Sequence, residues 1–209
     1  MQVEQTYNIK EENKVYVIGD ESTGKFNLLS HFFKNDFSSA PHRYQKDKIL
    51  ISKYKLPQKN VEFTFKLIPN VHSEELLDIF NYEKEGVKCI FLVFSLLDKK
   101  TFDVIDKFAK NHLVFEHNYE VPVFLIGTKY DLVSTNNEAR AVTQEDVNLF
   151  IGDIHNYKYF EVSSKTGYGL ALLDKELAEL DELDDDDENE EGAKNEMKKG
   201  KDKISCSLF

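Results

Sequence analysis

The chain has no long hydrophobic run, which argues against a membrane-spanning helix. Its longest apolar stretch, residues 90–97, is far shorter than the ~20 residues that a helix needs to cross a bilayer. The polar N-terminus also lacks the pattern of a secretory signal peptide. These absences predict an intracellular protein that does not span a membrane.

Cysteine is scarce, with two residues in the whole chain. Cys89 lies in an apolar, strand-like run, whereas Cys206 is close to the C-terminus. Two cysteines so placed give no disulfide framework. We expect Cys89 to be an ordinary core residue.

The globular part carries little net charge of either sign. The formal net charge is −11, but residues 181–196 contain ten acidic residues and one lysine, a local charge of −9 that leaves −2 for the rest. A nucleic-acid-binding domain normally shows a strongly basic patch. The sequence therefore predicts no nucleic-acid partner.

The chain does contain enough apolar and aromatic residues for one core. It is 41% hydrophobic and includes 16 Phe and 10 Tyr among 209 residues, which suits a single α/β domain. We expect an N-terminal extension at 1–12, a globular domain at 13–180 and a tail at 181–209.

The pattern of apolar residues predicts alternating strands and helices. Expected strands are 14–20, 48–56, 61–68, 87–97, 121–127 and 159–162, and expected helices are 24–34, 72–84, 99–117, one starting at 143–146, and 170–183. Alternation in 61–68 predicts a hairpin strand with one exposed face. This order favours a doubly wound, mostly parallel six-stranded sheet with one antiparallel edge strand and helices on both faces.

A phosphate-loop pattern, glycine and four residues followed by Gly-Lys, occupies 19–25 between a predicted strand and helix. Backbone N–H groups in such a loop and the Lys25 ammonium can bind a pyrophosphate. The alternative is a tight turn with a surface lysine. The candidate residues are Gly19, Glu21, Ser22, Thr23, Gly24, Lys25 and Phe26.

Two further segments follow predicted strands, where ligands of α/β sheets bind. The first contains Thr128, Lys129 and Asp131, and the carboxylate can accept hydrogen bonds from guanine N1 and its exocyclic amine. The second contains Ser163, Ser164 and Lys165, where a backbone N–H can reach the guanine oxygen. Their order and spacing together indicate a guanine site.

These three motifs resemble those of the Ras superfamily of small GTPases over about residues 13–180. The resemblance implies a phosphate-loop G domain that binds GTP and GDP, and it implies that Phe37 packs edge-on against guanine; a simple core Phe is the alternative. Residues 91–95 and 100–102 look like Rab proteins, whereas 127–129 look like Rho proteins, without that group's full insert helix.

The chain departs from the family wherever magnesium and the γ-phosphate are handled. Phe26 replaces a magnesium-binding hydroxyl, no threonine occurs between Thr23 and Thr64, and residues 69–73 lack the Asp-x-x-Gly-Gln pattern. Ser38 and Ser39 offer the only nearby hydroxyls, and His72 is expected to be a surface residue. We assign no catalytic residue and no metal ligand, leave Mg²⁺ open, and expect weak or absent hydrolysis.

The tail resembles a lipid-anchored terminus. Five lysines between 194 and 203 precede Cys206-Ser207-Leu208-Phe209, which fits a prenylation signal with a terminal Phe that favours geranylgeranyl. A prenyl group and a basic stretch together anchor proteins to membranes. We expect a peripheral protein at the cytoplasmic face of a membrane.

Three functions stay open from the sequence. The first is a membrane-anchored guanine-nucleotide-binding protein in vesicle traffic or signalling. The second is a pseudo-GTPase that binds no nucleotide and serves as a membrane-tethered interaction scaffold for protein partners. The third, an ATP-dependent phosphotransferase, conflicts with residues 128–131 and lacks an obvious catalytic carboxylate.

Overall fold

The computed structural model describes most of the predicted globular domain. The described residues are 13–33, 50–55, 61–68, 71–72, 86–114, 121–135, 140–151 and 156–180. Within these ranges no helix is long and apolar enough to cross a membrane. The predicted helix at 72–84 lies outside them except for His72.

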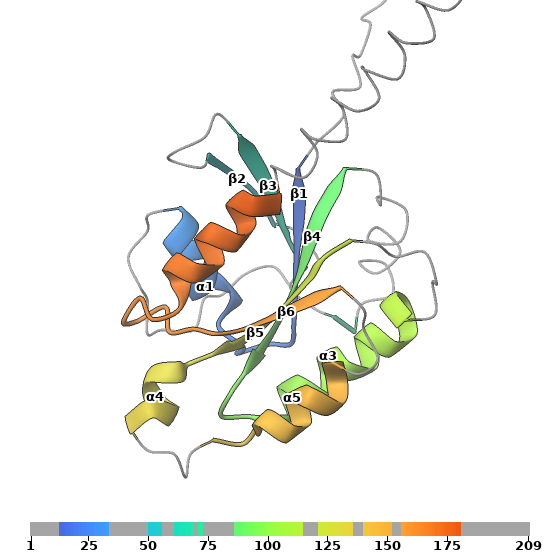
Figure 1. Ribbon diagram of the computed structural model, residues 1–209, viewed down its shortest axis with the longest axis vertical. Coiled ribbons are helices and arrows are strands. Elements are labelled where there is room, and N and C mark those ends of the chain that lie inside the picture. The colour runs from blue at the N-terminus through green and yellow to red at the C-terminus, as the bar shows by residue number, and fades with distance from the viewer. Residues whose placement is uncertain are drawn as a thin grey trace, which may run out of the picture. The chain divides into compact units, whose positions relative to one another are not determined.

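A six-stranded sheet forms the centre of the domain, in the spatial order β2-β3-β1-β4-β5-β6 (Figure 1). The strands are β1 (Lys14–Ile18), β2 (Leu50–Lys55), β3 (Glu62–Leu67), β4 (Val87–Ser95), β5 (Val123–Thr128) and β6 (Tyr157–Glu161). All neighbours pair in parallel except β2 and β3. The predicted mostly parallel sheet with one antiparallel edge strand is confirmed.

Helices lie between β1 and β2, between β4 and β5, and between β5 and β6, and the last two connections join parallel strands. They are α1 (Lys25–Phe32), α3 (Lys99–Ala109), α4 (Tyr130–Thr135) and α5 (Gln144–Ile151), and a π-helical turn, η1 (Lys110–Val114), extends α3. Residues 170–180 form a further helix. The predicted helix 99–117 therefore changes to π geometry after Ala109, and α4 was not predicted.

The start of α5 confirms the helix start predicted at 143–146. The Thr143 hydroxyl accepts a hydrogen bond from Asp146 N at 3.1 Å, and Asp146 Oδ2 accepts one from Thr143 N at 2.8 Å. This reciprocal pair is a capping box in which Asp takes the usual place of Glu. Asp98 caps α3 by accepting from Lys100 N at 3.0 Å.

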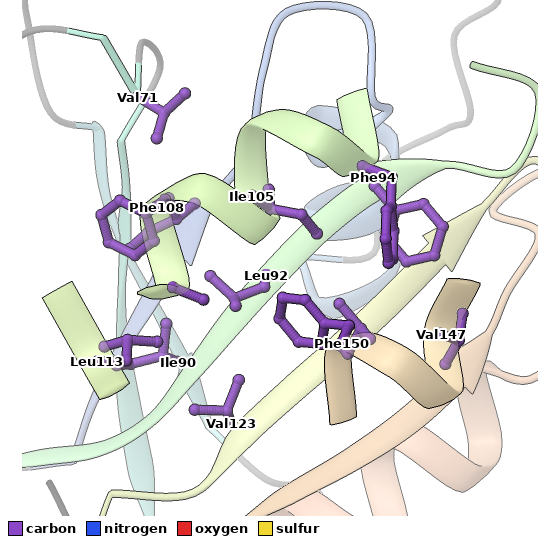
Figure 2. Close-up of a cluster of buried hydrophobic side chains, with 14 of the residues drawn as sticks. Val71, Ile90, Leu92, Phe94, Ile105, Phe108, Leu113, Val123, Val147 and Phe150 are labelled. Carbon is purple, nitrogen blue, oxygen red and sulfur yellow. The ribbon is translucent and has the colours of Figure 1, made fainter. Parts of the chain in front are cut away.

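One face of the sheet packs against α3 and α5. Figure 2 shows Ile105 and Phe108 from α3 and Phe150 from α5 facing the side chains of β4 and β5. The strand residues on this face alternate in sequence, for example Ile90, Leu92 and Phe94, which are fully buried. Strand pleat and helix spacing thus produce one continuous core layer.

The other face is lined by aromatic rings and covered by α1. Phe32 of α1 lies 4.8 Å from Phe65 of β3 between ring centroids. Phe91 stacks on Phe124 at 5.5 Å, and Phe124 contacts Phe160 at 5.1 Å. Helices on both faces explain why β4 and β5 are continuous apolar runs. Cys89 is also buried, as predicted for a core residue.

The predicted exposed face of the 61–68 strand is wrong. Thr64 and Lys66 are only 4% and 5% exposed, and within β3 only Glu62 is exposed. The reason is position: β3 is an interior strand, with β2 on one side and β1 on the other. On this face Thr64 and Lys66 lie beside Lys14 and Tyr16 of β1, which are themselves buried, so the whole face is covered, which the alternating pattern alone cannot reveal.

Because five strands run in parallel, their carboxyl ends meet at one edge of the sheet. The segments at 19–25, 128–131 and 162–165 leave this edge from β1, β5 and β6. β1 lies centrally: the next two strands of the chain, β2 and β3, lie on one side of it, and β4, β5 and β6 lie on the other. Ligands of open α/β sheets bind at such a point.

Candidate nucleotide-binding site

The phosphate loop turns sharply between β1 and α1 and needs its glycines. A Cβ at Gly19 would lie 2.2 Å from the carbonyl oxygen of Val93, so no side chain fits there. Gly24 has φ 90°, the left-handed conformation that glycine adopts without strain. Ser22 has φ 60° and is exposed. The backbone therefore passes β4 closely and enters α1, where the first N–H groups of a helix have no partner within the helix itself.

Lys25 lies inside the loop rather than on the surface. It is 3% exposed, and its Nζ donates to the Gly19 carbonyl at 2.7 Å, with Thr23 Oγ1 at 3.4 Å. Burial lowers the pKa of Lys25 to about 8, although the charges of Asp20 and Glu21 oppose this shift. The alternative of a surface lysine on a turn is therefore wrong.

Thr128 joins the phosphate loop to the end of β5. Its hydroxyl lies within hydrogen-bonding distance of two carbonyl oxygens, those of Thr23 and of Phe94, the latter at 3.0 Å. Gly24 approaches the same side chain, since a Cβ there would lie 3.5 Å from Thr128 Oγ1. The first and second predicted motifs are thus in direct contact.

Asp131 is held by a residue of the third motif. Ser163 Oγ donates to Asp131 Oδ1 at 2.7 Å, across 32 positions of sequence. Ser163 is fully buried and its Oγ also accepts from Thr166 N at 3.2 Å. The serine therefore fixes the orientation of the carboxylate and leaves the second oxygen available to a ligand.

The remaining members of the two motifs lie beside this pair. Lys129 adopts φ 65°, and burial lowers its pKa, an effect that the charge of Asp98 opposes. Ser164 is half-buried and Lys165 is exposed at the tip of the loop after β6. The loop is closed by the bond from Gly167 N to the Ser163 carbonyl at 2.8 Å.

Two contacts around these loops were not predicted from the sequence. Tyr130 and Tyr168 stack at 4.0 Å with an interplanar angle of 11°, which links the 128–131 and 163–169 segments. Arg140 forms a two-pronged ion pair with Glu161, each N–O distance being 2.8 Å. Long-range pairs like these leave no local sequence pattern. Both contacts stabilise the segments that are predicted to bind the guanine base.

Glu161 sits in a charged network directly before the third motif. Tyr159 donates its hydroxyl to Glu161 Oε1 at 2.6 Å, beside the Arg140 pair. Burial alone would raise the pKa of Glu161, but the hydrogen bonds from Arg140 and Tyr159 and the Arg140 charge outweigh it and lower the pKa. The carboxylate is therefore ionised at neutral pH.

The described residues around α1 do not fit a magnesium site of the family's kind. Phe26 stands half-buried at the first helical turn and has no oxygen to offer. The nearest hydroxyl in the loop, that of Thr23, donates to the Asp20 carbonyl at 3.0 Å. His72 is 65% exposed and lies 4.0 Å from Asp20 Oδ1, a surface position as predicted. No step through a metal follows from these residues.

Three predicted features lie outside the described residues. They are Phe37, the two hydroxyls at Ser38 and Ser39, and the lipidation candidate Cys206. The segment 69–73 is described only at Val71 and His72. Their roles stay predictions.

The arrangement defines a class of protein: an α/β domain whose phosphate loop and base-reading loops meet at the carboxyl edge of one sheet. Comparison with known proteins specifies it further. The family model described as "Ras family" matches residues 14–180. This protein belongs to the Ras family, and membership implies a guanine-nucleotide ligand.

Several curated relatives are similar over most of the chain. GTP-binding protein yptV5 of Volvox carteri is 23% identical over 155 residues, which cover 73% of this chain and 73% of that protein. Ras-related protein Rab7 of Cenchrus ciliaris is 23% identical and covers 74% of each chain. Ras-related protein Rab-11B of Dictyostelium discoideum is 28% identical over 72% of this chain and 65% of its own length. The predicted likeness to Rab proteins is confirmed at the level of distant homology.

Proposed function

We propose that this protein is a Rab-like guanine-nucleotide-binding protein that is lipid-anchored at the cytoplasmic face of a membrane. It acts in vesicle traffic or signalling and hydrolyses GTP weakly or not at all. The observation that carries the proposal is the joined site: Thr128 contacts the phosphate loop, and Ser163 orients Asp131. One bound nucleotide spans both halves.

Guanine selectivity follows from the chemistry of Asp131. A carboxylate oxygen accepts hydrogen bonds, and guanine presents donors at N1 and its amine, whereas adenine presents an acceptor at N1. The bond from Ser163 at 2.7 Å fixes the carboxylate before the ligand arrives. A preorganised acceptor that meets the wrong base stays unpaired, which makes discrimination strong.

Weak hydrolysis follows from what the loop cannot supply. Phosphoryl transfer in these proteins depends on magnesium, backbone positioning and an oriented water. Phe26 removes one magnesium ligand, and residues 69–73 contain neither the acidic residue nor the glutamine that would complete the set. Binding and turnover are therefore separable in this chain.

The membrane assignment rests on the C-terminal sequence. Cys206 lies in a prenylation signal, and the lysines between 194 and 203 supply a second, electrostatic attachment. The Cys206→Ser variant should move from the membrane pellet to the supernatant in cell fractionation. Retention in the pellet contradicts the lipid anchor.

The nucleotide proposal is tested on purified full-length protein. Denaturation and chromatography identify any co-purified nucleotide, and titration with fluorescent GDP in EDTA and in magnesium gives the affinity. We expect guanine nucleotide whose binding survives the chelator. Asp131→Ala should abolish it, whereas the matched change Asp103→Ala on α3 should not. Single-turnover assays should show negligible phosphate release.

A nucleotide-free scaffold is the second candidate, and Phe26 favours it because the usual metal cannot support the phosphates. The same titration separates the two functions. Failure of the full-length protein to bind either GDP or GTP would refute the proposal and leave the scaffold. Preferential binding of ATP would instead restore the phosphotransferase.

A further inference from the structure

The phosphate loop has a net negative charge, although its expected ligand is also negatively charged. Residues 19–26 contain two carboxylates, Asp20 and Glu21, against the single cation Lys25, so the loop is net −1 before a ligand binds. A bound nucleotide adds several negative charges at the same place. In most phosphate sites basic groups and a metal ion offset that charge.

The two carboxylates are placed differently. Asp20 Oδ1 accepts the backbone N–H of Glu21 at 2.8 Å and lies 4.0 Å from His72 Nε2. Its charge therefore has local partners. Glu21, the next residue, is exposed and lies in the turn between β1 and α1. Both carboxylates lie near enough to the Lys25 ammonium that their charges raise its pKa against the larger effect of burial.

The cation available to the phosphates is also partly engaged. Lys25 Nζ is bonded to the Gly19 carbonyl at 2.7 Å and also to that of Asp20. The position that would bring a second cation, Phe26, has no ligand atom. Backbone N–H groups and one shared ammonium are thus what the described loop offers to a polyphosphate.

We propose that Glu21 is a specificity-determining residue that makes this site prefer guanosine diphosphate to guanosine triphosphate. The inference rests on the proposed function, since it names the ligand state of the same site. A third phosphate adds negative charge at a loop that already holds the Glu21 carboxylate near the Lys25 ammonium, and the described loop supplies no magnesium ligand at Phe26 to offset it. The carboxylate repels it, whereas the diphosphate is bound by the inner N–H groups.

The test is competition binding with the full-length protein, with GMP, GDP and GTP as probes. We expect the Kd for GTP to exceed the Kd for GDP by at least about tenfold at low ionic strength, and the ratio to shrink with added salt because charge repulsion is screened. Glu21→Gln should lower the ratio about five- to tenfold through tighter GTP binding, the size expected for one nearby like charge. Glu145→Gln, an exposed change on α5, should leave it unchanged.

The outcomes separate this inference from the function on which it rests. If the wild type binds GTP as tightly as GDP, or if Glu21→Gln leaves the ratio unchanged, the role of Glu21 is refuted while guanine-nucleotide binding stands. If no guanine nucleotide binds to the wild type, both are refuted.

Discussion

Replacing Thr128 by Val tests whether the two halves of the site depend on one hydroxyl. Val keeps the shape of the side chain and removes the oxygen that contacts the carbonyls of Thr23 and Phe94. Thr128 is 3% exposed, so water cannot replace the lost donor. The hydroxyl has one proton, so the variant loses one buried donor, and leaving a buried acceptor short of its donor costs about 1 to 3 kcal/mol.

This cost should appear in two measurements. The Tm of a protein of this size falls by roughly 2 to 4 °C for each kcal/mol of lost stability. We therefore expect a thermal melt to show a fall in Tm of roughly 2 to 12 °C. In a titration, the Kd for GDP should rise by about tenfold, or ~1.4 kcal/mol, because the ligand must then hold together two loops that the hydroxyl no longer joins. Thr128→Ser keeps the oxygen and serves as the control. If the Val variant matches wild type in both measurements, the contact has no energetic role.

Three further changes test the parts of the site one at a time. Ser163→Ala removes the donor to Asp131, so GDP affinity should fall about five- to tenfold by calorimetry, while GMP and GDP are affected alike. Because the pKa of Lys25 is about 8, the affinity for GDP should decline as the pH rises through 8, with proton uptake on binding; a flat profile contradicts a role for its charge. Arg140→Met leaves Glu161 without its ion pair and should cost about 1 to 2 kcal/mol of unfolding free energy at pH 7 in urea melts. Since the pKa of Glu161 is lowered, the stability that the pair contributes is present above the usual value of 4.5 and is lost below it, so wild type and variant should converge in acid.

Much of the fold was predictable because parallel strands covered on both faces are continuous apolar runs. The strands at Val87–Ser95 and Val123–Thr128 were predicted within two residues at each end. The helix start at Thr143 was also predictable, since a capping box has a local pattern. By contrast, the burial of Lys66 depends on whether the folded chain covers that face of β3, and no local pattern encodes that.

The site, too, has features that could be predicted from the sequence and features that could not. The two motifs that contain Lys25 and Asp131 were visible as short spaced patterns, because phosphate and guanine recognition need given residue types at given places. Their mutual contact through Thr128, and the bracing by Tyr168 and Glu161, join segments far apart in sequence. Such pairs emerge from the folded geometry alone.

The close approach of Gly19 to Val93 changes what the phosphate-loop glycine says about ligand binding. A side chain there would collide with the backbone of the adjacent strand at 2.2 Å, so a descendant of this protein that had abandoned nucleotides would still need glycine at that position to fold. Position 26 is not restricted in this way, because it holds a half-buried phenylalanine in the first turn of α1. In this fold, therefore, the glycine is required for folding whether or not a nucleotide binds, whereas Lys25 and Asp131 are the residues that indicate nucleotide binding.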